Sequence, residues 1–415
     1  MKKQLSIFPQ FFTVFLDLLG IGIIIPILAP LLLNPNETLL DAATSMDTRA
    51  IILGFLIASY PLAQFFGAPV LGALADQRGR KRVLLIALTG TLLGYLLFAY
   101  GIVTHQLWIL FASRILDGFT GGNIAIVQSS IADVSTEKTR SRNFGLVGMA
   151  FGLGFILGPY IGGKLADPTI VSWFNSATPF FFAALMTALN MVLVVFRFPE
   201  THTVAGAARV SILTGVKNLK KAFTTPNLRV LFIVVFLITI GFSFFTQFFS
   251  VYLINKFQFT QSDIGDYFAW IGLCVAIVQG ALIRPVSAKF NPETILSVSL
   301  IGLSAALALQ LLPTEAIWLY AITPLIALTN GFSMPSYTSL ISTSVSPKEQ
   351  GEILGINQSI QSLGQAIPPI LAGFLITVNQ YLPIITASVV MFIAWFVFMA
   401  FYKGRHPRVQ QHEVA

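Results

Sequence analysis

Long apolar stretches, separated by short segments rich in charged residues, proline and glycine, run through the whole chain. A helix needs about 20 apolar residues to cross a bilayer. Twelve such stretches predict membrane-spanning helices at about 8–33, 50–75, 83–103, 107–132, 143–166, 178–198, 229–254, 264–288, 294–312, 316–345, 351–376 and 381–402. The first stretch follows a basic start typical of signal peptides, but it is too long and no small-residue cleavage site follows it. We therefore expect an all-α integral membrane protein with twelve transmembrane helices.

The composition supports a membrane protein and excludes other classes. Only 10% of the 415 residues are charged and 55% are hydrophobic, whereas a soluble chain carries about 25% charged residues. So much apolar surface also excludes disorder. Cys274 is the single cysteine, so no intramolecular disulfide is expected. All four histidines lie in predicted loops or the tail, which argues against a metal site or a histidine proton relay. We expect no metal and no cofactor.

The basic residues indicate how the chain is oriented. A net charge of +8 would suit nucleic-acid binding, but 21 of the 25 Lys and Arg residues fall on one side of the predicted spans and three on the other. Basic loops stay on the cytoplasmic side, so we expect both termini to be cytoplasmic and no nucleic-acid partner. A multi-pass protein of a plasma membrane, such as the bacterial inner membrane, fits this pattern.

The two halves of the chain are related to each other. Glycines, prolines and one tripeptide recur at an offset of 213 and then 210 residues, matching Asp117-Gly118-Phe119 with Asn330-Gly331-Phe332, Gly145 with Gly355, Gly154 with Gly364, Pro159 with Pro369 and Gly163 with Gly373. Secondary transporters are built from such repeats, with a site between them. The repeat predicts a six-helix N-terminal half (1–198), a cytoplasmic linker (199–228), a six-helix C-terminal half (229–402) and a cytoplasmic tail (403–415).

The predicted linker contains a short amphipathic pattern. Apolar residues recur at helical spacing at Ile212, Val216, Leu219 and Phe223, and three lysines lie off this face. The pattern predicts a basic amphipathic helix on the inner leaflet. A soluble linker is the alternative.

The first cytoplasmic loop contains glycines, an acidic residue and basic residues in a particular order: Gly72, Asp76, Arg78, Gly79, Arg80 and Lys81. Gly79 permits a tight turn, and Asp76 can cap a helix or pair with a base. The loop resembles the signature of the major facilitator superfamily, although Gln77 stands where the family usually has a base. This resemblance implies the major facilitator fold and a loop that braces the two halves in the outward-open state. The alternative is a loop that only sets the topology.

Span four carries a pair of opposite charges. Arg114 and Asp117 are three residues apart and share one helix face. A lone charge at mid-membrane costs about 2.5–3.5 kcal/mol, and a neighbouring opposite charge reduces this cost. The segment resembles the Arg-x-x-x-Gly motif of the same superfamily. We expect a proton acceptor held near a cation, with a static ion pair as the alternative.

Span five carries small residues every four positions. This face and its neighbours consist of Gly154, Gly158, Pro159, Gly162 and Gly163. Glycines at this spacing let another helix approach closely, and Pro159 bends the helix. The run resembles the antiporter motif of the superfamily, which implies export. Close packing without directional meaning is the alternative.

Span one contains an acid about nine residues inside an apolar helix, Asp17. An unpaired carboxyl group at membrane depth marks a functional site, because low-dielectric surroundings favour its neutral form and let it take up and release a proton. The pattern from Leu16 to Pro26, with Gly20 and Gly22, resembles the tetracycline-efflux branch of the drug:proton antiporters. Tetracycline exporters carry a further acid in a second-half span, and this chain has none there, which argues against tetracycline as substrate.

The second half offers neutral polar groups for a substrate cavity. We select Gln247, Gln279, Asn330, Tyr337, Asn357 and Gln361. Phenylalanines crowd span seven at Phe242, Phe244, Phe245, Phe248 and Phe249. A neutral, aromatic wall suits an amphiphilic or cationic substrate. The alternative is that the rings face lipid and the amides join helices.

These patterns favour a proton-coupled exporter of small amphiphilic drugs or metabolites that works by alternating access. Asp17, Asp117 and Arg114 are its proton-coupling residues. We expect a functional monomer in the lipid bilayer, a small-molecule substrate, protons as the coupling ion and no enzymatic activity. A proton-coupled importer of a nutrient is the rival hypothesis, and a non-transporting sensor or membrane enzyme is a third. No phosphate-binding loop is present for ATP.

Overall fold

The computed structural model describes residues 8–34, 37, 39–135, 137–201, 211–225, 228–345 and 350–403, and they fold into helices. The first half consists of α1 (Phe8–Leu33), α2 (Met46–Arg78), α3 (Arg80–Val103), α4 (Leu107–Thr120), α5 (Asn123–Val134), α6 (Glu137–Leu165) and α7 (Thr178–Arg197). A short helix, α8 (Thr214–Thr224), precedes the second half. That half consists of α9 (Arg229–Phe257), α10 (Gln261–Ile277), η1 (Val278–Leu282), α11 (Ile283–Ser287), α12 (Pro292–Leu309), α13 (Ala316–Thr343), α14 (Gln350–Val378), α15 (Leu382–Val397) and η2 (Phe398–Lys403).

The helices form the twelve predicted spans, and their ends differ from the prediction by a few residues. Ten described helices are long and apolar enough to cross a membrane. Two spans contain interruptions that the sequence pattern did not reveal. Span four is broken into α4 and α5 at Gly121 and Gly122, and span eight passes through the π-helical segment η1. Each of the two adjacent glycines makes the helix about 1 kcal/mol less stable than alanine would, which favours a break at this point.

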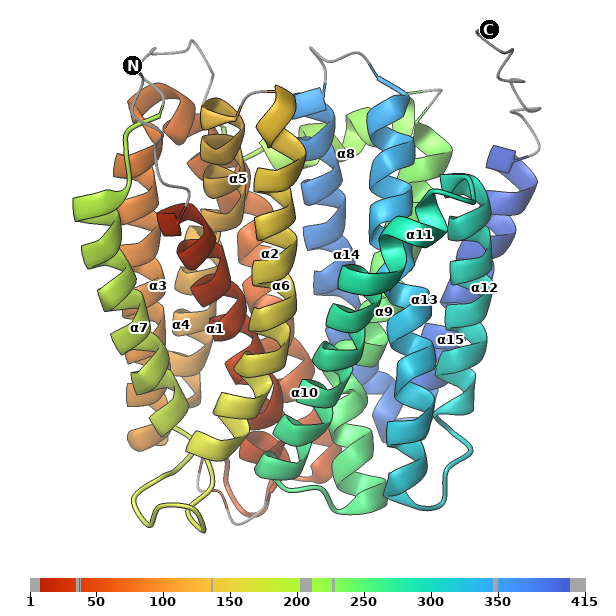
Figure 1. Ribbon diagram of the computed structural model, residues 1–415. Helices are drawn as coiled ribbons and strands as arrows, with labels where there is room; N and C mark the ends of the chain where they lie inside the picture. Colours follow the sequence, from red (N-terminus) through yellow and green to blue (C-terminus); the bar gives the residue numbers. More distant parts are fainter. Residues whose placement is uncertain are drawn as a thin grey trace, which may run out of the picture.

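The helices lie in two groups of six spans. Figure 1 shows α1 to α7 on one side and α9 to η2 on the other, with α6 and α10 side by side between them. Helices α2 and α14 form a second contact between the groups. We call the end of the bundle at which α2 ends and α3 begins, at the top of Figure 1, the basic end, because Arg78 and Arg80 are the residues at these helix ends. The opposite end is the far end.

Matched glycines of the two halves make matched contacts. A Cβ on Gly118 of α4 would lie 2.3 Å from Tyr60 O on α2, and one on Gly331 of α13 would lie 2.9 Å from Val278 of η1. In the same way, Gly154 of α6 packs against α1, and Gly364 of α14 packs against α9. The repeat read from the sequence is therefore a structural repeat, in which the second half reuses the helix contacts of the first.

The two halves touch closely at the far end, and glycines toward the basic end are less closely packed. At the far end, a Cβ on Gly54 would lie 2.3 Å from Pro369 O, and one on Gly163 would lie 2.6 Å from Gln261 O. Toward the basic end, a Cβ on Gly72, Gly280 or Gly355 would meet nothing within 4 Å. The halves are thus in close contact at the far end, whereas these three glycines toward the basic end face open space.

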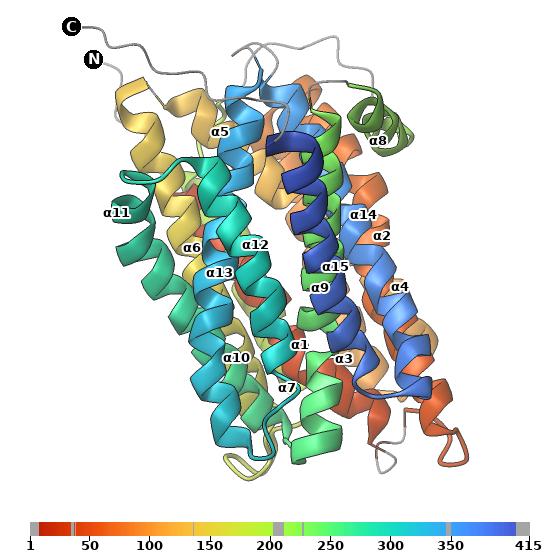
Figure 2. The same cartoon turned by 90° about the vertical axis from the view of Figure 1, so that its right-hand side faces the viewer.

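Helix α8 lies between α2 and α14 near the basic end (Figure 2). Gly215 packs against Phe65 O of α2, and Asn218 Nδ2 donates to Ser359 Oγ of α14 at 3.1 Å. The helix buries Gly215 and Ala222. Of the predicted apolar face, Leu219 packs against the core and Phe223 contacts the Phe236 ring of α9, whereas Ile212 and Val216 are exposed. Most of the predicted linker before α8 (202–210) and most of the predicted tail (404–415) lie outside the described residues.

Candidate functional site

The structure brings the predicted acids of spans one and four together. Asp17 of α1 and Asp117 of α4 line one cavity of about 10 Å³, which is room for about one water molecule. Asn123 Nδ2 donates a hydrogen bond to Asp17 Oδ1 at 3.1 Å. We call the group formed by Asp17, Asp117, Arg114 and Asn123 the acidic centre.

Arg114 compensates the negative charge of one of the two acids, Asp117. Its Nη1 lies 3.6 Å from Asp117 Oδ2, and the exposed fractions of the two residues are 8% and 6%. The guanidinium group also lies 4.4 Å from the centre of the Tyr60 ring on α2. An ion pair and a cation–π contact both stabilise a buried cation. The predicted pairing of Arg114 with Asp117 is present, and Asp17 lies outside this pair.

Glycines allow the helices around the acidic centre to approach closely. A Cβ on Gly20 of α1 would lie 1.8 Å from Tyr95 OH, and one on Gly94 of α3 would lie 2.8 Å from Asp117 Cβ. At the break of span four, a Cβ on Gly121 would lie 2.7 Å from Tyr60 OH. Each glycine therefore makes room for a polar side chain in the centre or beside it.

Sequence reasoning missed Asn123 of this centre and the two tyrosines that line its cavity, Tyr60 and Tyr95. Tyr60 and Tyr95 line the same cavity as the acids, and Asn123 is 3% exposed. A signal for Asn123 was present, because a glycine pair followed by an amide interrupts an otherwise apolar span. The two tyrosines had no such signal, because tyrosines are also common at membrane interfaces.

The glycine face of α6 packs against the helix that carries Asp17. A Cβ on Gly154, Gly158 or Gly162 would lie within 2.5–2.7 Å of atoms of α1 between Leu18 and Ile23. Gly163 faces the other way and packs against Gly265 of α10 in the second half. Pro159 lies between these two faces and contacts both Gly22 and Gly265. Helix α6 thus connects the acidic centre with the interface between the halves.

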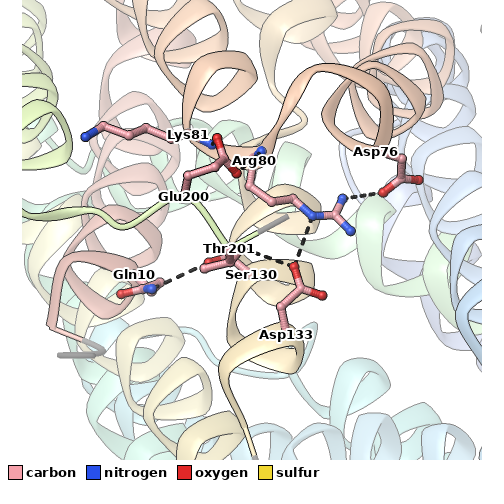
Figure 3. Close-up of polar contacts among 8 residues, drawn as sticks. All are labelled: Gln10, Asp76, Arg80, Lys81, Ser130, Asp133, Glu200 and Thr201. Carbon is pink, nitrogen blue, oxygen red and sulfur yellow. Dashed lines mark hydrogen bonds and ion pairs between the residues drawn. The ribbon is translucent and has the colours of Figure 1, made fainter. Parts of the chain in front are cut away.

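The predicted loop motif forms a compact charge cluster within the first half (Figure 3). Arg80 Nη1 lies 2.6 Å from Asp76 Oδ1, and Arg80 Nε lies 3.4 Å from Asp133 Oδ2 of α5. Gly79 has a φ of 96°, a region that favours glycine, and Arg78 is exposed.

Glu200, which follows α7, completes the loop cluster. Its Oε1 accepts the backbone N–H of Arg80 at 2.8 Å, and its Oε2 accepts that of Lys81 at 3.2 Å. The carboxylate thereby caps the N-terminus of α3, where unpaired N–H groups favour an anion. A Cβ on Gly79 would lie 2.4 Å from Glu200 Oε2, so glycine is needed here for space as well. Sequence reasoning did not identify Glu200 or Asp133, because both are distant from the loop in sequence.

The second-half candidates are only partly brought together. Gln361 Nε2 donates to Tyr337 OH at 3.4 Å, and Gln247 Nε2 donates to Ser243 Oγ at 2.7 Å and to Gln365 O of α14 at 3.2 Å. Asn357 is 7% exposed, and its Oδ1 has no partner among the described residues. Gln279 lies in η1 and Asn330 in α13, both partly exposed.

The expected aromatic wall on span seven is corrected by the structure. Phe244, Phe245, Phe248 and Phe249 are buried in the core of the second half, each at most 2% exposed. Phe249 packs against the rings of Phe245, Tyr252 and Tyr267. These rings stabilise helix packing rather than line a cavity. The apolar run alone did not show which face of the helix is buried.

Comparison with known proteins identifies the family. The sequence profile of the Major Facilitator Superfamily matches residues 10–367, with a further match over residues 231–414. The chain belongs to this superfamily. The predicted membership of this superfamily is therefore confirmed.

Relatives within the superfamily cover nearly the whole chain. Tetracycline resistance protein, class B, of Escherichia coli is 29% identical over 388 residues, which are 93% of this chain and 90% of that protein. Multidrug resistance protein 2 of Bacillus subtilis (strain 168) is 28% identical over 385 residues, 92% of this chain and 91% of that protein. The crystal structure of the human organic anion transporter MFSD10 (TETRAN) has a TM-score of 0.74 and 24% identity, covering 94% of this chain and 98% of that chain.

These comparisons confirm the predicted fold class of two six-helix halves with the major facilitator fold. As a major facilitator, the protein is a multi-pass membrane transporter rather than an enzyme. Its relatives in bacteria are named for resistance to drugs.

Proposed function

We propose that this major facilitator is a proton-coupled exporter of small amphiphilic compounds, which exchanges substrate for protons by alternating access. The observation that carries the proposal is the acidic centre, in which two carboxyl groups line one small cavity inside the first half and a guanidinium group pairs with one of them. The drug-resistance names of the relatives support export of amphiphilic compounds.

The charges of the acidic centre explain why a proton is needed. Arg114 and Asp117 form a neutral pair, so a negative charge on Asp17 is the uncompensated charge. Leaving one charge at membrane depth costs about 2.5–3.5 kcal/mol. A proton on Asp17, or a cationic substrate beside it, removes this cost, and either one thereby permits the halves to rearrange. Competition between proton and substrate for this role is the basis of exchange.

The packing explains how the charge state of Asp17 acts on the interface. Asp17 lies on α1, which fits closely against the glycine face of α6, and α6 in turn meets α10 at Gly163. Close packing transmits small shifts rather than absorbing them. Protonation of Asp17 therefore changes the fit of α1 on α6 and, through α6, the contact between the halves.

We propose that the substrate binds between the halves, against the neutral groups of α9, α13 and α14. Asn357 has an unpaired carbonyl oxygen, and Gln247, Tyr337 and Gln361 add further neutral donors and acceptors. In the described residues of the second half, Asp and Glu occur only near helix ends. A pocket of this kind suits an amphiphile whose polar group is neutral or cationic.

The distribution of basic residues supports one orientation of the protein in the membrane. We propose that the basic end and both termini face the cytoplasm, so that the structure is open to the cytoplasm and closed at the outer surface. One proton entering down 100 mV supplies about 2.3 kcal/mol, which supports a gradient of about fiftyfold for a neutral substrate. We further propose that the protein works as a monomer, with protons as the coupling ion and no other cofactor.

Transport in everted membrane vesicles tests this function. We expect a proton gradient that is acid inside the everted vesicles, and therefore directed outward, to drive accumulation of the amphiphilic cation ethidium by the wild-type protein. Asp17→Asn should abolish the accumulation at unchanged expression. Ethidium leaving the vesicles instead would support an importer, and a gradient that has no effect on any of a panel of amphiphiles would refute proton coupling.

A further inference from the structure

We propose that Asn123 is the positioning residue that responds to the charge of Asp17. Its amide N–H holds the charged carboxylate, and its carbonyl oxygen accepts the O–H of the protonated carboxyl group. This inference rests on the proposed role of Asp17 as a proton carrier and adds the group that distinguishes its two states.

The first of the two bonds is present in the structure. Asn123 is the first residue of α5, directly after the glycine break of span four, and it is 3% exposed. Its Nδ2 donates to Asp17 Oδ1 at 3.1 Å. A hydrogen bond to an ionised carboxylate is about twice as strong as one between neutral groups. The break of span four thus positions an amide donor where Asp17 has no cation as partner.

The second bond is indicated by two unpaired oxygens. Asp17 Oδ2 and Asn123 Oδ1 are both shielded from solvent, and neither has a hydrogen-bond partner among the described residues. Buried polar atoms without partners are rare. Two oxygens cannot bond to each other without a hydrogen between them, and a proton on Asp17 Oδ2 supplies it. The terminal torsions of Asp and Asn are soft, so a small rotation can add this bond to the existing one.

The other charged and titratable groups that face Asp17 have different roles. Arg114 pairs with Asp117 and lies against the Tyr60 ring. Tyr95 OH occupies the space beside Gly20 of α1. The face of α6 packed on α1 consists of glycines and adds no charge. Among the described residues, Asn123 is therefore the side chain with a hydrogen bond to Asp17. The cavity beside both residues has room for a water molecule that delivers the proton.

Infrared difference spectroscopy on the purified full-length protein tests the inference without a known substrate. The carbonyl band of protonated Asp17 is assigned as the titrating band that Asp17→Asn removes. In Asn123→Leu we expect this band to move to higher frequency, because the O–H has lost its acceptor. We also expect the pH midpoint of its titration to rise by about one pH unit, because the lost charge-assisted bond was stronger than the lost neutral one. Asn123→Ala should give the same two shifts if the leucine variant does not fold.

A second buried asparagine of the same half provides the matched control. Asn190 of α7 is 0% exposed and accepts a hydrogen bond from Thr13 of α1 at 3.1 Å, one turn from Asp17. Asn190→Leu should leave the frequency and the midpoint of the Asp17 band unchanged. A band that behaves in Asn123→Leu as it does in the wild type would overturn the role of Asn123 alone. If Asp17→Asn removes no titrating band, the proposed proton-carrying function fails, and this inference fails with it.

Discussion

An ion pair between the two halves closes the far end of the transporter. Lys164 Nζ of α6 lies 2.8 Å from Asp266 Oδ2 of α10, and it also donates to Ser262 Oγ at 2.8 Å. These bonds can form only while α6 and α10 are in contact at this end, where Gly163 meets Gly265. Breaking them should therefore favour the conformation that is open at the far end.

The size of this effect follows from the exposure of the pair. The side chains of Lys164 and Asp266 are 29% and 42% exposed, and partly exposed ion pairs contribute about 0.5–1 kcal/mol. Since 1.4 kcal/mol is a factor of ten, Lys164→Met should raise the ratio of far-end-open to far-end-closed molecules about two- to fivefold. Spin labels at Met46 and Val378, exposed far-end positions of α2 and α14, report this ratio as a distance distribution.

Two controls make the measurement specific. Lys256→Met removes a far-end lysine whose contacts, Tyr252 OH and Leu311 O, lie within the second half, so the ratio should not change. The double variant Lys164→Met with Asp266→Asn should shift the ratio no further than Lys164→Met alone. The labels require the background Cys274→Ser. A distance distribution in Lys164→Met identical to that of the parent protein would refute the reasoning.

Three further predictions test the packing of the site. Gly158→Ala places a Cβ 2.7 Å from a backbone oxygen of α1, so thermal unfolding in detergent should show a loss of about 1–3 kcal/mol, whereas Gly355→Ala, with nothing within 4 Å, should show none. Asn218→Leu removes the 3.1 Å bond from α8 to α14 and should speed hydrogen exchange of α8 about two- to tenfold; an unchanged rate would mean that this bond does not hold α8. Glu200→Gln weakens the anionic cap of α3 and should cost about 0.3–1 kcal/mol, a loss that high salt should diminish; equal melting at low salt would contradict it.

The sequence was sufficient to predict the spans and the repeat because both depend on local composition. An apolar run must be long enough to cross a bilayer, so its ends can be read from the sequence. Helix α1, for example, begins and ends at the predicted residues, Phe8 and Leu33. The sequence predicted that Asp17, Arg114 and Asp117 share a role in proton coupling. It did not predict that Asp17 lies close to the Arg114–Asp117 pair. The geometry of this arrangement depends on glycines of α1, of α3 and of the break after α4 that admit side chains from other helices.

The remaining errors concern contacts between distant segments. Phe245 and Phe249 were expected at a cavity, but a nearly all-apolar helix such as α9 gives no periodic signal of its buried face. Glu200 reaches the start of α3 from about 120 residues away, and no local pattern indicates such a contact. Asn123 was missed because a neutral amide in a span is compatible with either packing or function.

The comparison of coupled and uncoupled transport by Asp17→Asn in proteoliposomes tests the central claim most directly. Two rates are measured with ethidium: accumulation driven by an imposed proton gradient, and exchange of labelled for unlabelled ethidium at equal pH. The account predicts that Asp17→Asn loses the gradient-driven accumulation but retains exchange, because the variant is permanently neutral at this position. Gradient-driven accumulation at the wild-type rate in Asp17→Asn would contradict the account.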